Sequence, residues 1–142
     1  GSETFRTIWN RNGRIPKMGR HIEEQIIEKE LSYTKLIVKI SRIGKDIHMT
    51  LQGGEKPHIG CVVLAVPRPS LDGNGTGSST ASVINVTGHK DEILCRWMAE
   101  QVAARENAVT VCCGGFHMDH ITKEQILEVK KAAEEMIRTL LK

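Results

Sequence analysis

The chain of 142 residues is long enough to bury a core in one domain, and its hydrophobic content of 39% is that of a folded globular protein. No apolar run approaches the roughly 18 residues of a membrane span, and no signal-peptide pattern is present, so we expect a cytoplasmic protein with no membrane partner. The net charge of +3 is uneven, because residues 3–20 carry +4 and the rest carries −1. The nearly neutral body, in a chain with only 4% aromatic residues, argues against nucleic acid as a partner.

Residues 1–31 are predicted to form a basic arm that leads into a short helix. Over 18–31 the apolar residues Ile22, Ile26, Ile27 and Leu31 fall on one helical stripe. A helix of this length is marginal alone, so the stripe must pack on its own domain or on a second copy. We therefore expect a homodimer. The arm itself is either a solvated segment or a contact for phosphate or an acidic partner.

Residues 32–142 are predicted to form a single α+β domain. Residues 35–43 and 46–52 alternate apolar and polar side chains on either side of Gly44-Lys45, which predicts an antiparallel hairpin. The run IGCVVLAV, at 59–66, is apolar on both faces, which is typical of a central strand that is covered on both sides. Pro67 and Pro69 are expected to end that strand.

The second half of this domain alternates strands and helices. A flexible loop over 70–80 precedes a strand at 81–86, a helix from about 89 to 106 that buries Ile93, and a strand at 108–113. Thr122 and Gln125 then predict a capping box at the start of a last helix, whose buried stripe begins at Ile126. The result is a five-stranded, mostly antiparallel sheet in the chain order β-β-β-β-α-β-α, with both helices packed on it.

The four cysteines, Cys61, Cys95, Cys112 and Cys113, form no C-x-x-C pair. A chain of this length does not need a disulfide scaffold, and cysteine is among the residue types that are most often buried. We expect free, mostly buried thiols in a reducing compartment.

Three turns combine glycine with histidine: GGEKPHIG at 53–60, GHKD at 88–91 and GGFHMD at 114–119. Glycine lets the backbone approach a ligand closely, and histidine offers a hydrogen-bonding group near neutral pH. In the middle turn, Gly88 precedes a predicted helix whose free N–H groups and dipole favour an anion, and Lys90 adds a positive charge within the first turn of that helix. This turn is the best candidate seat for a phosphate or carboxylate group.

Three other kinds of site are conceivable for these turns and the nearby glycine-rich loop. His58, His89, His117 and His120 could ligate a metal ion, although the spacing of the last two is a weak signal. Cys113 and His117 could form a nucleophilic pair if their side chains met. The GNGTGSST stretch lacks the Gly-Lys-Ser/Thr ending of a phosphate-binding P-loop.

The stretches GGEKPHIG, ASVINVTGHKDEIL and CCGGFHMDHITKEQI together resemble the prenylated-flavin chaperone-like family. These are small accessory proteins of the kind associated with gallate decarboxylase, related in fold to proteasome-assembly chaperones. The resemblance spans about residues 33–141. It implies a protein that binds prenylated FMN or FMN as cargo. The contact positions that it implies are Gly54, Pro57, His58, Ile59, Gly60, His89, Lys90, Gly115, His117 and Asp119.

The family resemblance also implies a role. The protein is expected to be non-catalytic and to help deliver the flavin to a UbiD-type decarboxylase, its partner. Because aromatic residues are few, the isoalloxazine ring would rest on Pro57, Phe116 or aliphatic side chains. The alternative is an assembly chaperone of the same fold that binds proteins and no small ligand.

Overall fold

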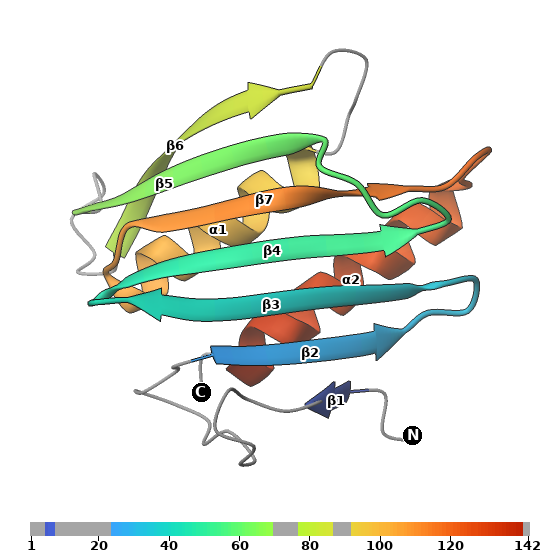
Figure 1. Ribbon diagram of the computed structural model, residues 1–142, viewed down its shortest axis with the longest axis horizontal. Coiled ribbons are helices and arrows are strands. Elements are labelled where there is room, and N and C mark those ends of the chain that lie inside the picture. The colour runs from blue at the N-terminus through green and yellow to red at the C-terminus, as the bar shows by residue number, and fades with distance from the viewer. Residues whose placement is uncertain (1–4, 8–23, 70–76, 87–91, 141–142) are drawn as a thin grey trace.

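The computed structural model describes residues 5–7, 24–69, 77–86 and 92–140. They form one seven-stranded sheet, in the spatial order β1-β2-β3-β4-β7-β5-β6, and two helices (Figure 1). Six of the strands have seven to nine residues, whereas β1 has three. The elements are β1 (Phe5–Thr7), β2 (Glu24–Glu30), β3 (Lys35–Ile43), β4 (Asp46–Gly54), β5 (Cys61–Pro69), β6 (Gly77–Asn85), α1 (Glu92–Glu106), β7 (Thr110–His117) and α2 (Lys123–Leu140).

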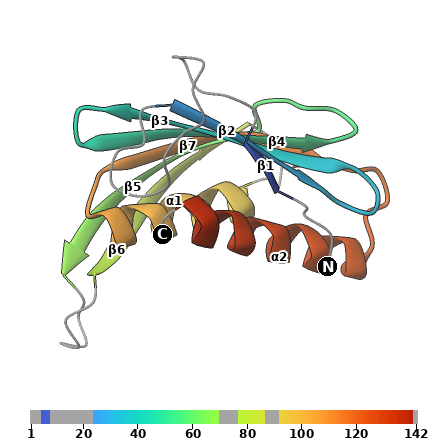
Figure 2. The same ribbon diagram turned by 90° about the horizontal axis from the view of Figure 1, so that it is seen from below.

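The molecule has two layers. Helices α1 and α2 both lie on one face of the sheet (Figure 2). The core lies between these layers, where alternate strand residues such as Leu51 and Val63 meet helix residues such as Met98 and Met136. None of the described helices lies on the opposite face, which is called the helix-free face below.

From Ser32 onward, the chain order β-β-β-β-α-β-α is confirmed. The predicted hairpin is β3–β4, with Leu36 paired to Gly53 at one end and Ile43 to Asp46 at the other. Its turn has Gly44 at φ 61°, a left-handed conformation that glycine adopts without a steric penalty. The prediction of five strands was wrong, because β1 and β2 extend the sheet before residue 32.

The predicted helix over 18–31 was also wrong where the structure describes it, since residues 24–30 form strand β2. The alternate residues Gln25, Ile27 and Lys29 are buried. Lys29 is tolerated there because its Nζ lies 2.9 Å from the Glu135 carboxylate of α2. Ile27 therefore packs in the chain's own core, and the helical stripe expected to mediate a homodimer does not exist over residues 24–30.

Strand β7 lies between β4 and β5, so these sequence neighbours are not neighbours in space. It pairs in parallel with β4 and antiparallel with β5, and every other strand pair is antiparallel. The prediction of a mostly antiparallel sheet is thus confirmed. Residues 114–117, expected to be a turn, belong to β7, and residues 77–80, expected to be a loop, belong to β6.

The described helices and strands cover β5 on one face only. Cys61, Val63 and Ala65 are buried beneath the helices. Val62, Leu64 and Val66, on the helix-free face, remain 40–45% exposed. The expectation that both faces of this strand are buried therefore fails for the single chain.

The capping box at the start of α2 is confirmed. The Thr122 N–H donates to Gln125 Oε1 at 2.9 Å, and the Gln125 N–H donates to Thr122 Oγ1 at 3.1 Å. The buried helix faces differ in detail from the prediction, because Ile93 of α1 is mostly exposed and Ile126 of α2 is partly exposed. The cysteines are free as expected, and only Cys113 is not fully buried.

Candidate functional site

The loop at residues 55–60 crosses the end of β7 on its way from β4 to β5 (Figure 1). Two backbone hydrogen bonds attach it to that strand. The Glu55 N–H donates to the His117 carbonyl at 2.7 Å, and the Gly60 N–H donates to the Gly114 carbonyl at 2.8 Å. The glycine-rich stretch is therefore a bridge over a strand inserted from later in the chain.

Two glycines make this crossing possible. Gly54 has φ 82°, and a Cβ there would collide with the backbone of His117. Gly115 lies under the loop, and a Cβ there would come within 2.7 Å of His58 Nε2. The His58 ring therefore packs directly against Gly115, in the space that a larger side chain at this position would fill.

His58 and His117 face each other on the helix-free side of this sheet end. Their ring centroids are 6.2 Å apart and their planes are 80° apart. The His58 Nδ1–H can donate to the Lys56 carbonyl at 2.8 Å, which in a neutral ring leaves the lone pair on Nε2, over Gly115. His117 Nε2 lies 2.9 Å from Asp119 Oδ1.

Asp119 is held as a carboxylate. The hydrogen bond from His117, with the nearby charge of Lys56 acting in the same direction, lowers the pKa of Asp119 below its usual value. The carboxylate in turn orients the His117 ring. His58, His117 and Asp119, which we call the histidine cluster, thus offer oriented donors and acceptors.

The predicted contact positions fall into three groups. Gly54, Gly60 and Gly115 shape the crossing loop, and the histidine cluster lies on it. Pro57 and Ile59, from the same loop, are exposed. His89 and Lys90 lie outside the described residues, although the preceding Val86 donates its N–H to the Gly60 carbonyl at 2.8 Å.

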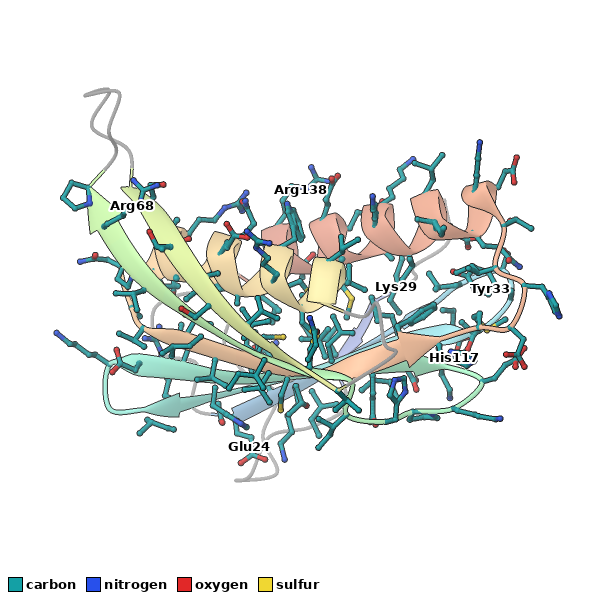
Figure 3. All side chains as sticks on the ribbon, turned by 90° about the horizontal axis from the view of Figure 1, so that it is seen from above. Glu24, Lys29, Tyr33, Arg68, His117 and Arg138 are labelled. Atoms are coloured by element: carbon teal, nitrogen blue, oxygen red, sulfur yellow. The ribbon has the colours of Figure 1, made fainter. Side chains whose placement is uncertain are left out.

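Phe116 lies on the other side of the sheet from the histidine cluster. Its ring packs edge-on against Tyr33, with centroids 6.3 Å apart, and lies against Gly53 on the helix side. Figure 3 shows Tyr33 and His117 at the same end of the sheet. Phe116 is therefore not placed to support a ring bound at the histidine cluster, contrary to one of the expectations above.

Sequence reasoning missed Lys56. Its carbonyl accepts the hydrogen bond that orients His58, and its charge acts on Asp119. The signal that could have found it is its place between the glycines of GGEKPHIG. A turn that positions a histidine through its own backbone is difficult to recognise from residue types alone.

The two chemical alternatives gain no support from the described residues. Among them, no group of three or more His, Cys, Asp or Glu side chains could hold a metal ion. Cys113 and His117 are four positions apart on one strand, which is about 13 Å. Burial also raises the pKa of the Cys113 thiol, which disfavours the nucleophilic thiolate.

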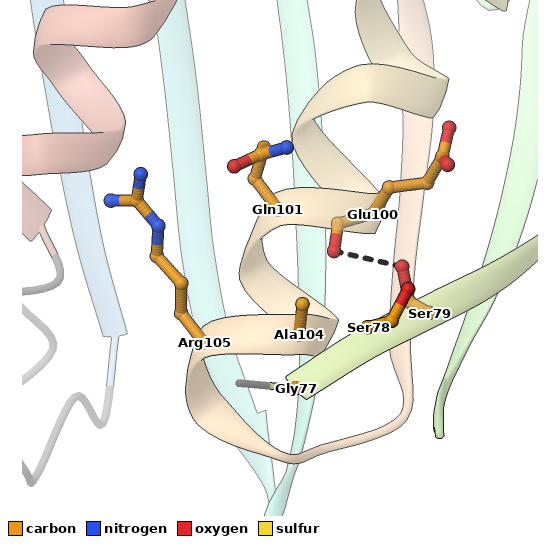
Figure 4. Close-up of a pocket in the computed structure, with 7 residues that line it drawn as sticks. All are labelled: Gly77, Ser78, Ser79, Glu100, Gln101, Ala104 and Arg105. Atoms are coloured by element: carbon orange, nitrogen blue, oxygen red, sulfur yellow. Dashed lines mark hydrogen bonds between the residues drawn. The ribbon is translucent and has the colours of Figure 1, made fainter. Parts of the chain in front are cut away.

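A cavity of about 510 Å³ lies at the opposite end of β6 (Figure 4). It is lined by Gly77, Ser78, Ser79, Glu100, Gln101, Ala104 and Arg105. The Ser79 hydroxyl donates to the Glu100 carbonyl at 2.9 Å, which ties β6 to α1. None of the predicted contact positions lines this cavity.

Comparisons with known proteins give a similar solved structure and a family. No described helix is long and apolar enough to cross a membrane. No curated protein matches the chain. A chain from the crystal structure of a chaperone complex for yeast 20S proteasome assembly is similar at 18% identity and a TM-score of 0.47, covering 85% of this chain and 100% of that one. Nothing about function follows from that likeness.

The family model described as the prenylated flavin chaperone LpdD-like domain matches residues 30–142. The match covers every described strand from β3 onward and both helices. It includes all three glycine–histidine turns on which the resemblance was based. The chain therefore belongs to the prenylated flavin chaperone LpdD-like family.

Proposed function

We propose that this protein binds prenylated FMN, or FMN, at the histidine cluster and helps deliver it to a UbiD-type decarboxylase without catalysing a reaction itself. The family match supports a flavin-related accessory role. The geometry of the crossing loop supports the location of the proposed site, because the loop holds His58 over Gly115 and opposite His117. Polar side chains therefore converge at one accessible sheet end.

The chemistry of the cluster suits reversible binding. A flavin ring edge presents carbonyl oxygens and N–H groups, which imidazole nitrogens and a carboxylate can satisfy. The His117–Asp119 pair is exposed enough for a ligand to leave again, with side-chain exposures of 42% and 58%. His89 and Lys90, at the predicted start of a helix, are the proposed seat of the phosphate.

Titration of the protein with FMN tests the binding site. We expect His58→Ala and His117→Ala to weaken binding by about three- to tenfold each, because one net hydrogen bond contributes roughly 0.5–1.5 kcal/mol. His120→Asn is the matched control. It removes an exposed imidazole from the same turn, and asparagine tolerates the left-handed conformation of this residue, at φ 56°. Unchanged affinity in both alanine variants would remove the cluster from the site.

Reconstitution of an apo decarboxylase tests the delivery role. The protein, loaded with prenylated FMN at limiting cofactor, should raise the yield of active decarboxylase without changing turnover per loaded site. The His58→Ala variant should give less active decarboxylase. Decarboxylation by the isolated flavin-loaded protein would contradict the non-catalytic assignment.

A further inference from the structure

The helix-free face carries an apolar patch beside the histidine cluster. It consists of Val62, Leu64, Val66, Ile84, Val111 and Cys113, from β5, β6 and β7. Val62 pairs with Ile84 on one side and with Cys113 on the other, and Leu64 pairs with Val111, so the side chains are contiguous. Ile84 is 74% exposed. None of the six carries a charge.

The patch continues into the proposed flavin site. Cys113 and Gly115 lie two positions apart on the same face of β7, which is about 7 Å, and His58 is seated on Gly115. The histidine cluster is itself half exposed. Sites for small molecules usually bury about 70–90% of the ligand surface, whereas this sheet end supplies one wall.

We infer that a second copy of this chain packs face to face on the apolar patch and supplies the opposite wall of the flavin site. The inference rests on the proposed function for the identity of the ligand, but not for the existence of the dimer. Strand β5 has the two-sided apolar pattern of a strand covered on both faces, and the described elements of the chain cover one. A stacked sheet lies about 10 Å away, which leaves room for interdigitating side chains.

A second copy fits this patch better than a charged partner does. Two-fold symmetry places the same uncharged residues against each other, so no charge is buried without a counterpart. The apolar patch spans β7, β5 and β6, which at about 4.8 Å between strands and 3.3 Å per residue over seven residues gives a footprint of roughly 330 Å². The helix-free faces of β3 and β4, where Lys35 and Lys39 are about half exposed, form a polar rim that extends the footprint to roughly 550 Å². This is near the lower end of what each partner contributes to a stable interface.

The oligomeric state of the full chain, measured by light scattering or sedimentation, tests the interface. We expect wild type to have the mass of two chains and Leu64→Lys that of one at the same concentration. Leu127→Lys is the matched control, because Leu127 lies on α2 at the other side of the molecule and is 65% exposed. It should remain a dimer. If circular dichroism shows that Leu64→Lys is unfolded, Ile84→Lys gives the same test, because Ile84 lies on the edge strand β6 and is more exposed than Leu64.

Flavin titration of the same variants tests the shared site. Leu64→Lys should bind FMN at least about tenfold more weakly than wild type, and Leu127→Lys should bind it equally well. A monomeric wild type that binds FMN would overturn the dimer and leave the proposed function intact. A wild-type dimer that Leu64→Lys dissociates, but that binds no flavin, would support the interface and contradict the function. A Leu64→Lys variant that remains dimeric would exclude this face, leaving it for another partner.

Discussion

At the scale of single residues, two adjacent glycines of β7 have different tasks. Gly114 has φ 142°, and a Cβ there would collide with the Leu51 backbone of the neighbouring strand. Gly115 would direct a Cβ at the His58 ring, which can move. Gly114 is therefore required for the pairing of β7 with β4, whereas Gly115 is required to leave room for His58. The first glycine serves the fold and the second serves the candidate site.

Alanine substitution should separate these tasks. Gly114→Ala should lower the free energy of unfolding by at least about 1–3 kcal/mol, because a non-glycine residue is strained at that φ and its Cβ also meets backbone. Gly115→Ala should leave the fold intact but displace His58, reducing FMN affinity about as much as His58→Ala. Denaturant unfolding and FMN titration of both variants check this. Equal unfolding midpoints for the two variants would contradict it.

The same scale shows what the sequence could indicate about the site. The sequence indicated His58, His117 and Asp119 as candidate site residues because they lie among glycines, and the structure brings these three side chains together. The sequence of the turns did not indicate on which face of the sheet each of these side chains lies. It depends on the alternation of β7, which places His117 on the helix-free face and Phe116 beneath it.

At the scale of elements, α2 is fixed at its start by local and distant contacts. The local contact is the reciprocal hydrogen bonding of Thr122 and Gln125. The distant contacts come from the segment between β2 and β3, where the Ser32 hydroxyl donates to Glu128 at 2.6 Å and the Tyr33 hydroxyl donates to the Gln125 carbonyl at 2.8 Å. The first kind was predictable from sequence and the second was not.

Thr122→Ala should destabilise the protein by about 1 kcal/mol, because an N-cap side chain satisfies a backbone N–H that the helix leaves without a partner. Thr139→Ala is the control. Its hydroxyl donates to the Glu135 carbonyl within the last turns of the same helix, and its loss should change stability by less than about 0.5 kcal/mol. Thermal or urea unfolding would compare them, and equal losses would argue against the cap.

Tyr33, whose hydroxyl contacts the start of α2, makes the stability of the protein depend on pH. Burial, followed by the charge of Glu128, raises the pKa of Tyr33 to about 12. A raised folded-state pKa means that the stabilisation is complete below the unfolded value of about 10 and is lost as pH rises toward 12. Tyr33 is the single tyrosine, so its phenolate absorbance should titrate near pH 12 in the folded protein and near 10 in denaturant. A folded midpoint near 10 would contradict this.

Strand β2 shows why some elements were mispredicted. Its Ile26-Ile27 doublet fits a helical stripe as well as a strand, and the strand alternation contains polar residues at buried positions. Lys29 is stable there because Glu135 lies opposite, 106 positions later in the chain. The hairpin β3–β4, by contrast, alternates cleanly and turns on a glycine, so local pattern and tertiary structure agree.

At the scale of the whole molecule, the layers explain both the two-sided character of the sheet and the proposed dimer. Two helices cover one sheet face, and the other face combines a polar half with the apolar patch. The sequence predicted a strand buried on both sides at 59–66, and this pattern fits β5 in the proposed dimer better than β5 as the described residues of one chain leave it. The order of β7 between β4 and β5 could not be predicted, because all three strands are apolar enough for the centre of a sheet.

The late insertion of β7 has a consequence during synthesis on the ribosome. Strands β1 to β6 leave the exit tunnel before β7, and they form two groups, β1 to β4 and β5 with β6, that have no hydrogen-bonded strand pairing with each other, because β7, which joins them, follows α1 in the chain. Until β7 emerges, the facing edges of β4 and β5 are unpaired, and the 55–60 segment has nothing to cross. The proposed flavin-binding end therefore forms only when nearly the whole chain has been made, so an unfinished chain lacks the proposed flavin site.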